Sequence, residues 1–199
     1  MDRIQALERS IRGYWDERTE TKRSFLLGHY KEMRPGFDKK LMEMIGEQVQ
    51  KRGVGGQKKI ASIYLVRPMT SLYTESYEMI LGMADRDLYL DEDRSEAYWY
   101  PELAYKDIDG DMREVERILK KRFIRLEGYE LSYLKLILLD DDQRLLQEVF
   151  LHLLDDAMDR LLGYASIWED ELQILAGDHM DEPVVLRRIK TSSARPMRA

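Results

Sequence analysis

The fold class is decided by one short stretch, IASIYLV at residues 60–66. It is rich in β-branched and aromatic residues, and it is bounded by the glycine-rich segment 53–56 and by Pro68. That composition is typical of a β-strand. Because helical patterns lie on both sides of it, the sequence predicts a predominantly helical α+β protein with a small antiparallel sheet at about residues 60–100.

Further strands are expected after Pro68. Residues 77–83 and 88–90 flank a short polar segment and predict a hairpin, and residues 97–100 predict another strand. Residues 70–84 also fit a helical stripe, so strand and helix both remain open for this segment. Strand is favoured because Gly82 lies inside it and residues 88–90 are too few for a helix.

The segment before the strand predicts a helical hairpin over 2–52. Apolar residues recur at helical spacing up to Arg34, although Arg18, Thr21 and Lys22 interrupt this stripe. Pro35-Gly36 should end the first helix, because proline lacks an amide donor and restricts the residue before it. The glycine-rich segment 53–56 should then end the second helix and form a flexible joint.

The segment after the sheet predicts a helical region over 109–177. Asp111 and Glu114 suit a capping box at the start of its first helix. A second helix should end near the acidic residues 140–142, and a long, apolar central helix should run from about 143 to 176. The domain expected is a single one, 1–182, with a sheet region at 58–101 and a basic, flexible tail at 183–199.

Composition and charge narrow the functional classes. The chain has no cysteine, which excludes disulfides, thiolate zinc sites and a cysteine nucleophile. It shows neither a secretory signal at its start nor an apolar run of about 20 residues, so a cytoplasmic protein without a membrane span is expected. Residues 60–177 hold 13 Lys/Arg and 26 Asp/Glu, which argues against nucleic-acid binding by this part.

Tyrosines concentrate in and around the predicted sheet. Aromatic side chains with polar tips suit a ligand pocket or a protein interface, and an edge strand suits pairing with a second copy. They suit equally well the core of a small sheet packed on helices. The candidate contact residues are Tyr64, Tyr73, Tyr77, Tyr89, Tyr98, Trp99, Tyr100 and Tyr105.

A second pattern lies on the predicted central helix. Glu148, His152, Asp155 and Asp159 share one sector of the helix and could bind a divalent cation together with ligands from a partner helix. The simpler interpretation is that they form the solvent-exposed face of an otherwise apolar helix. No metal or other cofactor is therefore expected.

These patterns favour a non-catalytic binding or regulatory protein that contacts a small ligand, a protein partner or a second copy of itself through the aromatic sheet region. The alternative is a metal-assisted enzyme that uses the acidic stripe. A nucleic-acid binder is disfavoured, because acidic residues are interspersed with the basic residues near the start of the chain.

Overall fold

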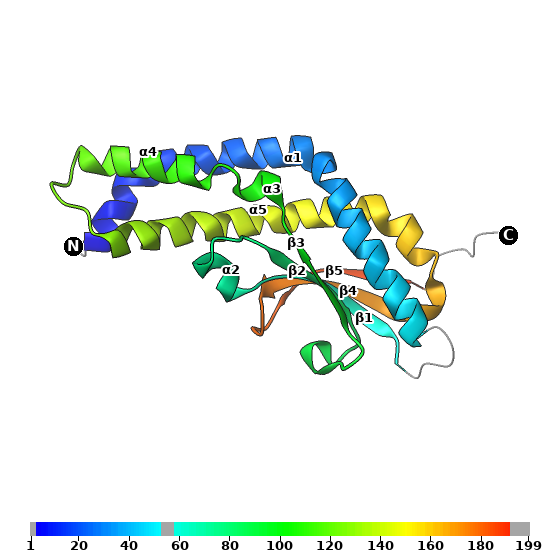
Figure 1. Cartoon of the computed structure of the whole chain (residues 1–199). Coiled ribbons are helices and arrows are strands. Elements are labelled where there is room, and N and C mark those ends of the chain that lie inside the picture. The colour runs from blue at the N-terminus through cyan, green and yellow to red at the C-terminus, as the bar shows by residue number, and fades with distance from the viewer. Residues whose placement is uncertain (1–2, 53–57, 192–199) are drawn as a thin grey trace. The chain divides into compact units, whose positions relative to one another are not determined.

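The computed structural model describes residues 3–52 and 58–191 (Figure 1). The predicted joint at 53–56 and the last eight residues of the predicted tail lie outside this part. Its elements, in chain order, are α1 (Arg3–Arg52), β1 (Ile60–Arg67), α2 (Met69–Tyr73), β2 (Met79–Ala84), the 3₁₀ turn η1 (Leu88–Leu90), β3 (Ser95–Trp99), α3 (Glu102–Tyr105), α4 (Ile108–Lys120), α5 (Gly128–Leu162), the 3₁₀ turn η2 (Ala165–Ile167), β4 (Trp168–Asp178) and β5 (Val184–Lys190).

The predicted fold class, α+β and predominantly helical, is confirmed, but the helical hairpin over 2–52 is wrong. α1 is one helix of 50 residues with Pro35 inside it. Proline costs about 3 kcal/mol in a helix interior, whereas burial of one large apolar side chain contributes about 1.5–3 kcal/mol. Phe37, Leu41 and Met44 are buried beyond Pro35, so continuing the helix is favourable.

Two compact units make up the chain. Unit 1 consists of Met1–Tyr30 and Glu102–Val149, and unit 2 consists of Lys31–Pro101 and Phe150–Ala199. The long helices α1 and α5 each contribute one part to either unit. Within the described residues, no helix is long and apolar enough to cross a bilayer.

Unit 2 contains a five-stranded sheet of order β3-β2-β1-β4-β5. β1 pairs with β4 in parallel, and the other pairs are antiparallel, so the sheet is mixed and larger than predicted. The predicted long central helix is present as α5, but its predicted bounds of 143–176 are wrong, because α5 runs from Gly128 to Leu162 and β4 begins at Trp168. Pairing with β1, which is distant in sequence, decides this segment, and residues 184–190 of the predicted tail form β5.

The strand partner predicted for β2 is also wrong. Residues 88–90 form the 3₁₀ turn η1, and β2 pairs instead with β3, with Met79 opposite Trp99 and Gly82 opposite Glu96. For residues 70–84, where the sequence leaves both helix and strand open, each prediction is correct for part of the segment. Met69–Tyr73 is a short helix, and Met79–Ala84 is a strand.

Every residue of β1 is buried, because both faces of the sheet are covered at its centre. On one face, Trp99 lies edge-on to Phe37 of α1, and Phe37 lies edge-on to Phe150 of α5. On the other face, Tyr64 belongs to an apolar cluster on which Tyr89 packs. The aromatic residues of this region therefore divide between the two faces.

Tyr64 spans three strands on that second face. Its ring crosses Gly82 of β2, and its hydroxyl donates a hydrogen bond of 2.6 Å to Glu96 of β3. Gly82 is opposite both residues in the sheet register. A glycine is needed at this point because any Cβ would overlap the tyrosine ring.

The alkaline stability of unit 2 should depend on Tyr64. Burial, followed by the hydrogen bond to Glu96, raises the pKa of its phenol well above the ordinary value of 10.0. Above the ordinary pKa of 10.0, Tyr64 loses its phenol proton in the unfolded chain but keeps it in the folded chain. The stabilisation that Tyr64 contributes therefore falls as the pH rises above 10.0. The unfolding free energies of the wild type and Tyr64→Phe should therefore begin to converge near pH about 10 and come closer as the pH is raised further. A gap that stays constant with pH would contradict this assignment.

Unit 1 is helical. α4 begins at Ile108, so Asp111 lies inside the helix and the predicted capping box is not formed. The predicted break at residues 140–142 is also absent, since α5 is continuous from Gly128. Asp142 lies inside α5, where its buried carboxylate is paired with Arg18 and Lys22 of α1.

Candidate ligand site

A cavity of about 580 Å³ lies within unit 1, a size typical of small-molecule sites. α1 supplies most of its lining from one face, because the lining residues recur three, four or seven apart along the helix. The rest of the lining comes from α4 and the residue before it. The lining residues are Tyr14, Glu17, Arg18, Thr21, Lys22, Phe25, Asp107, Asp111 and Glu114.

The floor of this cavity contains a buried ion network. Arg18 donates two parallel hydrogen bonds of 2.9 Å to the carboxylate of Asp142 and a third, of 2.7 Å, to Asp111. Lys22 donates one of 2.6 Å to Asp142. The side chains of Arg18, Lys22 and Asp142 are 4%, 8% and 0% exposed. Such charges are stable in an interior only when paired and hydrogen-bonded.

The two cations of the floor respond differently to their surroundings. Burial lowers the pKa of the Lys22 ammonium, and the charge of Asp142 opposes this effect while that of Arg18 adds to it. Burial also acts to lower the pKa of Arg18, but hydrogen bonds and charges from Asp142 and Asp111 outweigh it, so this pKa is raised. Lys22 is thus the less well compensated cation.

Lys22 retains donor capacity toward the cavity. An ammonium has three N–H donors, and within the described residues Lys22 uses one of them, on Asp142. Lys22 also lines the cavity. A buried charged donor without an acceptor is costly, so this position favours an acceptor brought by a ligand.

The rim of the cavity is acidic and aromatic. Glu17 and Asp107 are exposed, and neither forms a side-chain hydrogen bond or ion pair with the described residues. Tyr14 donates a hydrogen bond of 2.8 Å to Asp111. Phe25 already carries a cation on its ring, the ammonium of Lys106 at 4.5 Å from the ring centre. The carboxylates of Glu17 and Asp107 therefore make the rim suited to positive groups.

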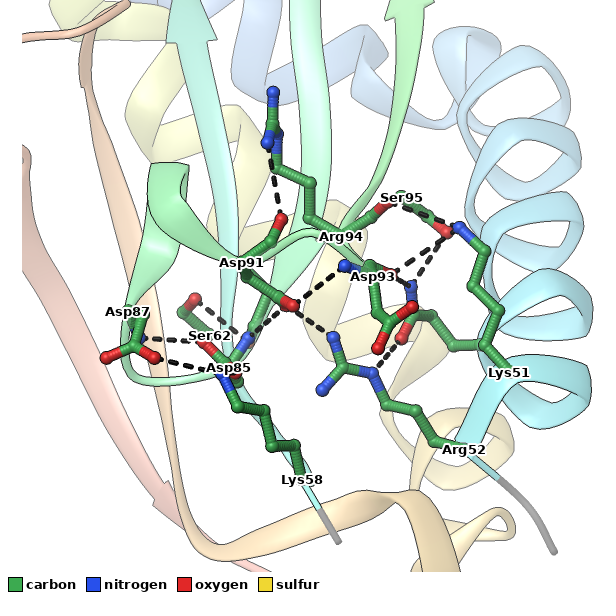
Figure 2. Close-up of polar contacts among 12 residues, drawn as sticks. Lys51, Arg52, Lys58, Ser62, Asp85, Asp87, Asp91, Asp93, Arg94 and Ser95 are labelled. Carbon is green, nitrogen blue, oxygen red and sulfur yellow. Dashed lines mark hydrogen bonds and ion pairs between the residues drawn. The ribbon is translucent and has the colours of Figure 1, made fainter. Parts of the chain in front are cut away.

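Unit 2 contains a second buried ion pair, shown in Figure 2. Arg52, at the end of α1, donates hydrogen bonds to Asp91 and to Gln48. The carboxylate of Asp91 also accepts hydrogen bonds from the backbone amides of Asp85 and Asp93. Burial acts to raise the pKa of the Asp91 carboxyl, but these amides and Arg52 outweigh it, so the pKa is lowered.

This second network holds the loop between β2 and β3 against the end of α1. Gln48 donates to the carbonyl of Asp93 at 2.6 Å and to Ser95 at 2.8 Å, and Lys58 pairs with both Asp85 and Asp87. The neighbouring cavity, which Lys58 and Asp85 help to line, measures about 230 Å³, below the usual range for ligand sites. We interpret this network as structural.

The predicted aromatic contact residues are not brought together as one surface. Tyr64, Tyr77, Trp99 and Tyr105 are buried, and Tyr105 belongs to unit 1. Tyr64 and Tyr89 do meet, edge to face, with ring centres 6.0 Å apart. The exposed residues are Tyr73, Tyr98 and Tyr100, at 80%, 60% and 45%.

The predicted acidic stripe is engaged in ion pairs along α5. Glu148 pairs with Arg23, and Asp155 pairs with Arg187 of β5. His152 and Asp159 are exposed. Among residues 3–52 and 58–191, no group of three or more His, Asp or Glu side chains is placed to hold a metal ion.

The ligand cavity was not foreseen from the sequence, although a signal for it exists. Arg18, Thr21 and Lys22 interrupt the apolar stripe of α1, and all three line the cavity. A polar interruption indicates only exposure or a bend until the partner of the charges is known. That partner, Asp142, is 120 residues away from Lys22 in sequence.

Comparison with known proteins adds no functional information. No family model, curated protein or solved structure matches the chain. The function therefore has to be argued from the chemistry of the cavity.

Proposed function

We propose that the protein is a non-catalytic binding protein that holds a small polar ligand in the cavity of unit 1. One observation carries the proposal: the buried ammonium of Lys22 lines a ligand-sized cavity and uses a single donor within the described residues. A ligand oxygen that accepts from Lys22 would satisfy this group without disturbing the pair between Arg18 and Asp142. The ion pairs around Lys22 hold the charged side chains in place, which supports recognition of a ligand by its charge and not a reaction of that ligand.

The proposal is tested by the change Lys22→Met. Methionine keeps most of the length of the side chain and removes the ammonium, and Asp142 keeps its two hydrogen bonds from Arg18. The variant should therefore fold. Thermal shifts of the full chain with a panel of small carboxylates, inorganic phosphate and amino acids should identify ligands that stabilise the wild type and not this variant.

Lys39→Met is the matched control, because Lys39 is an exposed lysine of α1 outside the cavity lining. It should respond to each ligand as the wild type does. Equal responses of the wild type and Lys22→Met to every stabilising compound would overturn the proposed site.

The aromatic surface expected from the sequence stays a second candidate, for a protein partner or a second copy. Tyr98 is exposed on β3, which is an edge strand of the sheet, and Tyr73 and Tyr100 are exposed as well. An exposed tyrosine on an edge strand, as at Tyr98, favours protein contact. The metal-assisted enzyme that would use Glu148, His152, Asp155 and Asp159 remains an alternative without a supporting observation in the described residues.

A further inference from the structure

The charges of the cavity in unit 1 are sorted by depth. The cations Arg18 and Lys22 are buried, whereas the carboxylates Glu17 and Asp107 are exposed. The lining also contains Asp111 and Glu114, but these are paired with Arg18 and Arg117, so Glu17 and Asp107 are its carboxylates without an ion pair to the described residues. A ligand entering this cavity therefore meets negative charge first and positive charge at the bottom.

This arrangement discriminates between simple ions. A ligand with only a negative charge could accept from Lys22, but it would be repelled by the exposed carboxylates of Glu17 and Asp107. A ligand with only a positive charge would suit Glu17 and Asp107, but it would leave the spare donors of Lys22 unsatisfied. A ligand that carries both charges avoids the two penalties.

Resting on the proposed function, we infer that the ligand is a small zwitterion of the amino-acid class, with its carboxylate on Lys22 and its ammonium between Glu17 and Asp107. The pairs already present in unit 1 show the same preferences. Lys22 donates a hydrogen bond of 2.6 Å to a carboxylate oxygen of Asp142. The ammonium of Lys106, the residue before Asp107 in the sequence, lies over the ring of Phe25. The Phe25 ring is already stacked on His29 and contacted by Lys106, so an aromatic side chain of the ligand is assigned to the part of the cavity beside Tyr14.

Three matched probes test the inference by calorimetric titration of the full chain. They are L-phenylalanine, 3-phenylpropanoate, which lacks the ammonium, and 2-phenylethylamine, which lacks the carboxylate. Each truncated probe should bind at least about tenfold more weakly than phenylalanine, since one charged hydrogen bond is lost in each case.

Two sets of variants assign the two charges. In Lys22→Met, phenylalanine should lose its advantage over 2-phenylethylamine. In the double variant Glu17→Gln/Asp107→Asn, it should lose its advantage over 3-phenylpropanoate. Asp16→Asn is the control for the rim, because Asp16 is an exposed carboxylate of α1 outside this lining, and it should change neither preference.

The outcomes separate this inference from the proposed function. If 3-phenylpropanoate binds as tightly as phenylalanine and needs Lys22, the zwitterion is overturned and the binding function stands. If 2-phenylethylamine binds as tightly as phenylalanine and is insensitive to Lys22→Met, the zwitterion and the role of Lys22 are both overturned. If none of the three probes binds, the zwitterion inference is overturned. If, in addition, the wider panel contains no ligand whose binding depends on Lys22, the proposed function is overturned as well.

Discussion

Gly82→Ala is expected to destabilise unit 2 by about 3 kcal/mol or more, at or above the upper end of the usual cost of overpacking. A methyl group at this position would overlap Cζ, Cε2 and the hydroxyl of Tyr64. Tyr64 is fully buried and its hydroxyl is bonded to Glu96, so moving its ring aside would disturb both the surrounding packing and that bond. Elsewhere in a strand, the same change would stabilise slightly by restricting the unfolded chain.

Chemical denaturation of Gly82→Ala should show a lower midpoint, and hydrogen exchange should locate the loss in β1, β2 and β3. Gly46→Ala is the matched control, because Gly46 lies on α1 in unit 2 with nothing within 4 Å of the position that an alanine methyl group would take. It should be neutral or stabilising by up to about 1 kcal/mol.

A double-mutant cycle separates the steric cause from other effects. Tyr64→Ala is itself destabilising, by about 3–5 kcal/mol for loss of a large buried aromatic ring. In that background, Gly82→Ala should cost much less than in the wild type, because the ring that it would overlap is gone. An equal cost in the two backgrounds would show that the contact with Tyr64 is not the reason for the glycine.

Asp142→Asn should destabilise unit 1 by about 3–5 kcal/mol, the range for removing one partner of a buried ion network. Asp142 accepts three hydrogen bonds from Arg18 and Lys22, and its side chain is completely buried. An amide is uncharged and has one oxygen, so the two buried cations would share a single remaining carboxylate, Asp111, which accepts from Arg18 and Tyr14 but not from Lys22. The unfolding midpoint should fall, with faster exchange in α4 and the first part of α5.

Adding Lys22→Met to Asp142→Asn should recover part of the loss, because one uncompensated cation is removed. Asp16→Asn, an exposed carboxylate of α1, should change stability by no more than about 0.5 kcal/mol. If Lys22→Met deepens the loss instead of reducing it, the buried charges are not the cause of the instability.

Local sequence patterns were sufficient for features that neighbouring residues control. The β-branched composition of residues 60–66 predicted β1, and the apolar spacing before Arg34 predicted a helix at the start of the chain. Pro101 closes the β3 segment as expected. In each case the property that decides the structure, a side-chain preference or an amphipathic period, is contained within about ten residues of chain.

The same patterns misled where a distant partner outweighed a local signal. Pro35-Gly36 is a strong local stop, but the apolar face beyond it is buried in unit 2, so α1 continues. Residues 168–176 are apolar enough for a helix, but pairing with β1 makes them a strand. Burial and strand pairing depend on residues about 100 positions away, and no local pattern contains them.

The candidate site shows the same division. The sequence of α1 determines the residue types of the site and their helical spacing, which places Arg18 and Lys22 one turn apart. Whether those cations are solvated or buried is decided by Asp142, which only the packing of α5 on α1 within unit 1 brings to them. Spacing along a helix is a local property, whereas desolvation is a property of everything that surrounds a charge, so the cavity and its ion network arise only from the tertiary structure.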